Sequence, residues 1–294
     1  MSFGMLIQAC GSASVSSLTR LDSVSAAMKD AGAARFTITL LAHFSSASGQ
    51  PKSVTAVSAS GIFDFATQQG YADITGGKTG SGTPRSYSAV FTPSVYYLGN
   101  FPNPSGLPSG TKWIEFPLSH LSLLQKCAPQ LFYQEGALNP YWYVIQLSSS
   151  VAKILSDANV TISGTPAEKL SLLTNLNKFK GTTGSAEEKF ELATVGASTF
   201  PTVVWLDSSN RILRFNQILY VSPKSVTGRA KGGPNEMLLT MDFSNFGTKL
   251  NLTPPNSGIL NIENYLRQQA SASKEETSGK ESPAVEANEC PGQS

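Results

Sequence analysis

The sequence is poor in the residues that bind metals and catalyse reactions. Only three cysteines and two histidines occur among 294 residues. A zinc site needs three or four such ligands at short spacing, and no pair among these residues has that spacing. Neither His43 nor His120 accompanies a serine elbow of the G-x-S-x-G type. We therefore expect no metal, no cofactor and no enzymatic activity, and a hydrolase would need an unrecognised site.

Charge and long apolar runs are also scarce. Charged residues make up 14% of the chain, and the net charge is +2 with no dense basic run. Nucleic-acid binders usually present a clustered basic face, so we expect no nucleic-acid partner. No run of 18 apolar residues occurs, and the sequence therefore predicts no membrane-spanning helix. Hydrophobic residues still make up 40% of the chain, enough for a packed globular body.

The first residues hold a cysteine at a boundary between two kinds of sequence. Ile7-Gln8-Ala9-Cys10 is similar to the processing motif of bacterial lipoproteins, in which the cysteine thiol receives a diacylglyceryl group. The following "GSASVSS" is a small, polar, flexible tether. We expect residues 1–9 to be the remnant of a signal peptide, Cys10 to be lipidated, and residues 10–17 to form the tether. The alternative is a frayed terminus with an incidental cysteine.

The body of the chain alternates between apolar and polar residues, which is typical of β-strands with two different faces. "ARFTITLLAHF" (34–44), "VTAVSASGIFDF" (54–65) and "YSAVFTPSVYYLG" (87–99) are examples, the last either one strand or two strands broken at Pro93. Near the end, "FPTVVWLDSSNRILRFNQILYVS" (200–222) predicts two strands joined by a tight turn at 207–210. The pattern predicts a sheet of many antiparallel strands.

Helices are expected at a few places among these strands. Leu18, Leu21, Val24 and Met28 recur at three- and four-residue spacing, which predicts an amphipathic helix that Gly32 can end. Further helices are expected at 119–132, at 139–147 and at 185–196. Asn139 and Pro140 suit the start of the second of these. We expect one domain over residues 18–267 and a disordered tail over 268–294.

Several of these segments together resemble a known family. "STFPTVVWLDSSNRILRF" (198–215) is similar to a strand-turn-strand signature of actinobacterial lipoproteins of the LppX/LprG type. "MDFSNFGTKLNLTPP" (241–255) resembles their closing strand, and "ARFTITLLA", "GIFDF" and "TKWIEFPL" resemble their early strands in the same order. Each motif is a weak strand or turn pattern. Their order between about Ser16 and Leu266 carries the resemblance.

The resemblance implies a fold and a function. The fold class is α+β, a strongly curved antiparallel β half-barrel with helices packed on the concave side, as in the LolA/LolB carriers. The function implied is that of an extracytoplasmic lipoprotein, anchored to the cell membrane through Cys10 and in part secreted. Members bind an acylated lipid or glycolipid in an apolar cavity and move it through the envelope, where a transporter is a possible partner.

A lipid cavity needs apolar side chains at every second position of the inner strand face, together with others from a helical lid. We predict that the following residues line it: Phe36, Ile38, Leu40, Phe63, Phe65, Phe91, Tyr97, Leu239, Met241 and Phe243 from the strands, and Leu131, Trp142, Val144 and Leu155 from the lid. Ordinary core packing is the alternative for each of them. A one-residue slip of register would invert a strand.

A second function is compatible with the same fold. If the half-barrel is filled by its own side chains, the chain is a non-enzymatic envelope module for interaction or signalling. A hydrophobic cavity or a co-purifying lipid would favour the carrier. The sequence does not decide which lipid is bound.

Overall fold

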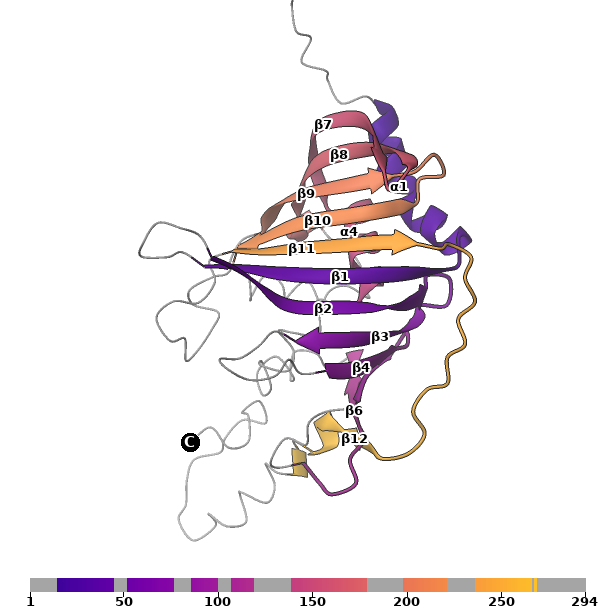
Figure 1. Cartoon of the computed structure of the whole chain (residues 1–294), viewed down its shortest axis with the longest axis vertical. Coiled ribbons are helices and arrows are strands. Elements are labelled where there is room, and N and C mark those ends of the chain that lie inside the picture. Colours follow the sequence, from indigo (N-terminus) through magenta and orange to yellow (C-terminus); the bar gives the residue numbers. More distant parts are fainter. Residues whose placement is uncertain are drawn as a thin grey trace, which may run out of the picture.

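The computed structural model describes residues 15–44, 52–76, 86–99, 107–118, 139–178, 198–220, 236–265 and 267–268. Its dominant feature is one open, curved sheet of 12 strands (Figure 1). The strands are β1 (Ala33–Phe44), β2 (Lys52–Asp64), β3 (Gln69–Gly76), β4 (Ser86–Phe91), β5 (Val95–Gly99), β6 (Trp113–Pro117), β7 (Val151–Ile162), β8 (Thr165–Asn175), β9 (Thr199–Leu206), β10 (Ile212–Tyr220), β11 (Glu236–Ser244) and β12 (Ile259–Asn261). The expectation of a mainly antiparallel sheet is confirmed.

The order of strands across the sheet is β12-β6-β5-β4-β3-β2-β1-β11-β10-β9-β8-β7. Neighbours are antiparallel, except that β12 pairs in parallel with β6. The strand β1 lies between β2 and β11, so the first strand pairs with the second-last strand in the middle of the sheet. The early strands form one wing of the sheet and the late strands form the other.

Two helices, α1 (Val15–Asp30) and α4 (Pro140–Ser149), lie on the same face of the sheet (Figure 1). We call this the inner face, because its side chains and those of the helices form one hydrophobic core. Leu21, Val24 and Met28 of α1 are buried in it, whereas Leu18 is 51% exposed. The expected helix is therefore present, but Leu18 does not belong to its buried face. Gly32, at φ +69°, follows the helix as expected.

The helix α4 begins where the sequence predicts. The side chain of Asn139 accepts a hydrogen bond from the backbone N–H of Tyr141 at 3.0 Å, and Pro140 occupies the first turn. Unlike an ordinary surface helix, α4 is buried on most of its circumference. The buried side chains are those of Pro140, Trp142, Tyr143, Val144, Gln146 and Leu147. The helices expected at 119–132 and 185–196 lie outside the described residues.

The register of the central strands gives the sheet its two faces. Phe36 pairs with Phe243, Ile38 with Met241 and Leu40 with Leu239, and all six side chains are at most 4% exposed. In β2 the alternation continues through Gly61 to Phe63. A Cβ at Gly61 would lie 1.9 Å from the carbonyl oxygen of Tyr71, so β2 and β3 approach too closely there for any larger residue.

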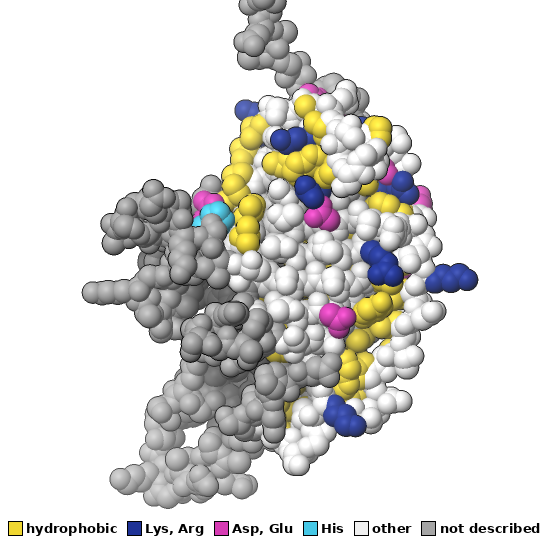
Figure 2. Space-filling view, in the orientation of Figure 1, with side chains coloured by type: hydrophobic (Ala, Val, Ile, Leu, Met, Phe, Trp, Pro, Cys, Tyr) yellow, Lys and Arg dark blue, Asp and Glu magenta, His cyan; other side chains and the backbone are white. Residues whose placement is uncertain are grey.

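The outer face of the sheet carries mainly short polar side chains. Thr37 pairs with Ser60 and with Asp242, and Thr39 pairs with Thr240. Figure 2 shows this face largely white, with scattered charged side chains, among them one adjacent cationic and anionic pair, and bands of apolar side chains. The contrast between the faces follows from strict alternation along each strand.

The turns expected in the late strands are also present. At the β9–β10 turn, the Asp207 carboxylate accepts backbone hydrogen bonds from Ser209 and Arg211, both at 2.9 Å. Asn210 adopts φ +62°, a conformation that Asn tolerates better than most residues. Asp207 also pairs with the guanidinium of Arg211 at 2.7 Å. Its role is therefore structural, as the sequence indicated.

Candidate functional site: the inner face of the sheet

Most of the residues predicted to line a cavity lie on the inner face. They share the hydrophobic core with α1 and α4, and each is at most 4% exposed. They are Phe36, Ile38, Leu40, Phe63, Phe65, Phe91, Trp142, Val144, Leu239, Met241 and Phe243. The structure therefore brings them together on one surface. Whether they contact a lipid stays a prediction.

Tyr97 does not lie on this surface, and the prediction for it is corrected. The turn between β4 and β5 is closed by a hydrogen bond from Thr92 N–H to the carbonyl oxygen of Val95 at 2.9 Å. This turn sets a register in which Tyr96, and not Tyr97, lies opposite Phe91. The ring centroids of Phe91 and Tyr96 are 5.2 Å apart. A sequence with two adjacent tyrosines does not show which of them faces inward.

Tyr97 instead lies beside Glu115 on the outer face, where the two residues are paired between β5 and β6. Partial burial, followed by the negative charge of Glu115 and a hydrogen bond to it, raises the pKa of Tyr97 above its ordinary value. The phenol therefore holds its proton more tightly in the folded chain.

Leu155 is the second correction. It lies on β7, the last strand of the sheet, and is 49% exposed. The register of β7 against β8 shifts between Ile154 and Ser156, so Leu155 lies at an irregularity and not in a lid. A further predicted lid residue, Leu131, and the predicted lipid acceptor Cys10 lie outside the described residues.

The wing made by β2 to β6 is lined by aromatic rings, and we call it the aromatic wing. The rings are those of Phe63, Phe65, Phe91, Tyr96 and Phe116. Neighbouring centroids are 5.1 to 6.0 Å apart, within the range of favourable ring contacts. The ring of Tyr141, on α4, is stacked on Phe63 at 6.4 Å. This wing therefore presents a continuous apolar wall against one end of α4.

The wing made by β8 to β10 differs, because it buries polar groups among its apolar side chains. We call Gln146, Thr174, Thr202 and Gln217 the amide cluster. All four are at most 1% exposed. The Gln217 amide nitrogen lies 3.2 Å from the Gln146 side-chain oxygen, 3.2 Å from the Thr174 hydroxyl and 3.3 Å from the Thr202 hydroxyl. The two threonine hydroxyls are 3.0 Å apart.

Two polar atoms of the amide cluster have no partner in the described structure. They are the side-chain nitrogen of Gln146 and the side-chain oxygen of Gln217, and both are buried. The sequence carries a signal for this cluster. Thr202 lies in phase with Phe200 and Val204, and Gln217 lies in phase with Phe215 and Leu219, so polar residues stood at inward positions of apolar strands.

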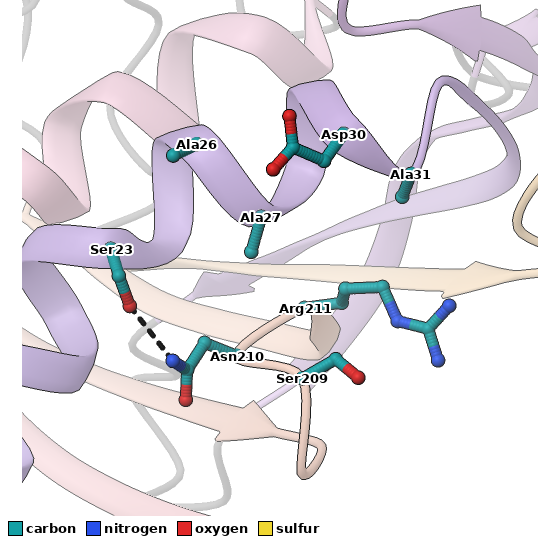
Figure 3. Close-up of a pocket in the computed structure, with 8 residues that line it drawn as sticks. All are labelled: Ser23, Ala26, Ala27, Asp30, Ala31, Ser209, Asn210 and Arg211. Carbon is teal, nitrogen blue, oxygen red and sulfur yellow. Dashed lines mark hydrogen bonds between the residues drawn. The ribbon is translucent and has the colours of Figure 1, made fainter.

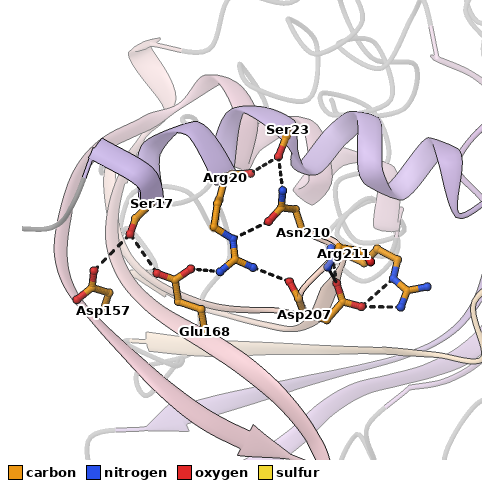
Figure 4. A network of polar contacts seen from close by, with 9 residues as sticks. Ser17, Arg20, Ser23, Asp157, Glu168, Asp207, Asn210 and Arg211 are labelled. Carbon is orange, nitrogen blue, oxygen red and sulfur yellow. Dashed lines mark hydrogen bonds and ion pairs between the residues drawn. The ribbon is translucent and has the colours of Figure 1, made fainter.

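A polar network fastens α1 to this wing (Figure 4). The guanidinium of Arg20 donates to the side-chain oxygen of Asn210 at 2.6 Å and to the carbonyl oxygen of Asp207 at 2.5 Å, and it pairs with Glu168. Ser17 donates to Glu168 at 3.1 Å. We call the contacts of Arg20 and Ser17 the α1 latch. They fix the first half of α1 over β8 and the β9–β10 turn.

A pocket of about 450 Å³ lies beside the latch, between α1 and the β9–β10 turn (Figure 3). Its lining includes Ser23, Asp30, Asn210 and Arg211, together with alanines of α1. The side-chain nitrogen of Asn210 donates to the Ser23 hydroxyl at 2.8 Å across one end of the pocket. The pocket is open to solvent and has charged side chains beside its alanines, so it does not suit an acyl chain.

Reactive groups are not assembled on the inner face. In the part of the chain that the structure describes, no three His, Cys, Asp or Glu side chains are grouped as a metal site would require. His43 lies on the outer face of β1, opposite Glu236. It is half-buried, with Nε2 fully covered. Among the described helices, none is both long and apolar enough to cross a membrane.

No protein-family model and no curated protein matches the chain. Solved structures do match. LprF from Mycobacterium bovis shares 13% identity over 84% of this chain and 100% of that chain, with a TM-score of 0.42. The Mycobacterium tuberculosis lipoprotein LppX shares 13% identity over 82% of this chain and 100% of that chain, with a TM-score of 0.46.

A LolA superfamily protein from Nitrosomonas europaea shares 12% identity over 83% of this chain and 96% of that chain, with a TM-score of 0.30. These matches are of the LppX/LprG and LolA types that the sequence resembles. At such identities, and with TM-scores below 0.5, these likenesses carry no argument about function. The function has to follow from the residues of the inner face.

Proposed function

We propose that this chain is a non-enzymatic lipid-binding protein that holds an acylated lipid or glycolipid between α4 and the inner face of the sheet. The observation that carries the proposal is the continuous apolar inner face, from Phe63 and Phe91 on one wing to Leu239 and Phe215 towards the other. The wall is held by backbone hydrogen bonds between strands. It can therefore keep its shape while its contents change.

The energetics of an acyl chain explain why such a wall is needed. A chain of about fifteen methylenes, at ~0.8 kcal/mol each, costs on the order of 12 kcal/mol to expose to water. A protein that carries it must replace that contact with apolar surface. The helix α4 is buried on most of its circumference, and its Tyr141 ring rests on Phe63 at the aromatic wing. An acyl chain inserted there would contact apolar groups on both sides.

The anchor is part of the same proposal. Cys10 would carry a diacylglyceryl group, because two acyl chains are needed for stable attachment whereas one gives only marginal binding. The polar residues between Cys10 and the start of α1 at Val15 would be the tether, which is shorter than the expected 10–17 because Ser17 is buried in α1. The chain would then work at the outer side of the cell membrane as one domain that begins with α1 and not at residue 18. It would take lipid from the bilayer, and an envelope transporter would be its partner.

A second function has an observation in its favour. The inner-face side chains of Phe63, Phe65 and Leu239 are fully buried by the chain itself. A core that stays filled in this way would make the protein an envelope interaction module with no lipid cargo. Extraction of the purified protein with organic solvent distinguishes the two functions. A carrier releases bound lipid, and an interaction module releases none.

The test uses the full chain and a Cys10→Ser variant, both made in a bacterial host that lipidates proteins. Extracted lipids are identified by mass spectrometry. We expect wild-type protein in the membrane fraction and C10S in the soluble fraction. We also expect about one non-covalent lipid per C10S chain. Folded C10S that carries no lipid, and takes up none from vesicles of host lipid, would refute the carrier function and leave the interaction module.

A further inference from the structure

The amide cluster is an unusual feature for the interior of a lipid-binding protein. Gln146 and Gln217 are fully buried, and each has one end of its amide without a partner in the described structure. A buried polar atom without a partner costs free energy, and native interiors retain few of them. Two such atoms on two amides that contact each other indicate a place made for a further polar group.

The number of unused donors and acceptors in the amide cluster is the same for either orientation of the two glutamine amides. As placed, the Gln217 nitrogen donates to the Gln146 oxygen, which leaves a Gln146 donor and a Gln217 acceptor unused. If both amides are turned over, the hydrogen bond between them reverses. The unused groups are then a Gln217 donor and a Gln146 acceptor. In either arrangement the cluster offers one donor and one acceptor.

The cluster lies inside the proposed lipid site and away from charge. Gln217 is paired with Leu239 on one side and with Thr202 on the other. Among the buried side chains that the structure describes, only that of Asp207 is charged at neutral pH. Asp207 lies at the opposite end of β9 and β10 and is paired with Arg211. The group that fits the cluster is therefore neutral.

A hydroxyl meets these requirements. It can accept a hydrogen bond from the free N–H of one glutamine and donate one to the free carbonyl of the other. A plain methylene chain can do neither and would leave both atoms without partners. We propose that the amide cluster selects lipids whose acyl chain carries a hydroxyl group, and that it binds this group at the inner face of the sheet. This proposal rests on the proposed function.

The experiment measures displacement of cis-parinaric acid from the delipidated full chain. The competitors are stearic acid and stearic acids that carry a hydroxyl at carbon 2, 3, 10 or 12. We expect at least one hydroxystearate to displace the probe about tenfold better than stearate, since two hydrogen bonds are gained that stearate cannot make. In the Q146M/Q217M variant this preference should fall to about one, while stearate binding is retained.

Asn216→Met is the matched control, because Asn216 is an amide next to Gln217 in sequence but lies on the outer face, paired with Thr240, and its buried side-chain oxygen also has no partner in the described structure. It should keep the preference. The thermal midpoint of the empty protein gives a second readout: Q146M/Q217M should equal or exceed the wild type, because atoms without partners have been removed. If that variant does not fold, Gln217→Met alone should show the same loss of preference.

Three results would overturn the inference. The hydroxystearates could all bind within about threefold of stearate, or the preference could persist in the variant. The empty variant could also be less stable than the wild type, which would indicate a structural network closed by a trapped water molecule. If neither parinarate nor stearate binds at all, the proposed function itself fails, and the inference fails with it.

Discussion

The two wings of the inner face bury different kinds of side chain. On the aromatic wing, rings from successive strands contact one another. On the wing of β8 to β10, apolar residues such as Phe200 and Leu172 surround the amide cluster, and the α1 latch closes one end. Among the described residues of β1–β6 no serine, threonine, asparagine or glutamine side chain is buried, although polar atoms of His43 and Tyr96 are covered, whereas Thr174, Thr202 and Gln217 all lie buried on β8–β10.

This difference suggests separate roles for the two wings, one in the stability of the fold and one in the selection of the bound lipid. Rings packed against rings contribute free energy of folding without requiring a partner. Amides with unused ends contribute less than their burial costs until a partner arrives. We infer that the aromatic wing mainly stabilises the folded sheet and that the amide cluster determines which lipid binds to it. Three substitutions test this comparison, from the largest expected effect to the smallest.

Phe63→Ala should have the largest effect on stability. The ring of Phe63 is fully buried and contacts Phe65, Phe91 and Tyr141. Its removal should cost about 3–5 kcal/mol of unfolding free energy, through lost burial and the cavity left behind. Urea unfolding measures this, with Thr202→Val as the control on the other wing. Equal losses for both variants would show that the wings do not differ in stability.

Arg20→Ala should have an intermediate effect, confined to α1. It removes the fork that joins Glu168, Asn210 and Asp207, and it leaves the poorly exposed Glu168 carboxylate without its cation. We expect a loss of about 2 kcal/mol, as for hydrogen bonds to charged groups. Amide hydrogen exchange should rise in α1 and stay unchanged in β2–β4. Uniform acceleration across the sheet would mean that the latch supports the whole fold.

Tyr97→Phe should have the smallest effect, visible only at high pH. Glu115 and partial burial raise the pKa of Tyr97 in the folded state. The resulting stability is present below the ordinary value of about 10 and is lost as the pH rises through the raised value. Thermal midpoints between about pH 9 and 12 should therefore fall more steeply for the wild type than for Y97F. Parallel curves would show that Tyr97 titrates normally.

The sequence predicts the inner face well where the strands alternate strictly. The spacing of Phe36, Ile38 and Leu40 shows their shared face, and the same holds for Leu239, Met241 and Phe243. It fails where register depends on contacts with other strands. Only the pairing of β4 with β5 shows that Tyr96 faces inward, and only the irregular pairing of β7 with β8 shows that Leu155 is exposed.

The amide cluster shows a different limit of sequence analysis. Its members come from α4, β8, β9 and β10, and they are far apart along the chain. In-phase polar residues such as Thr202 and Gln217 signal that something polar is buried. They do not show that four such groups meet, or that two atoms remain without partners. These two facts depend on how the strands pair and on where α4 packs against them, and the sequence pattern shows neither.

The most direct test of the central claim compares tryptophans on opposite faces of the sheet. Trp142 is buried in the core on α4, whereas Trp205 is half-buried on β9 between the cations Lys169 and Arg214. Two variants keep one of these tryptophans each, W113F/W205F and W113F/W142F, and each is titrated with 9,10-dibromostearate, which quenches indole fluorescence on contact. The account predicts saturable quenching of Trp142 and none of Trp205. Equal quenching of both, or none of Trp142 in the folded protein, would contradict it.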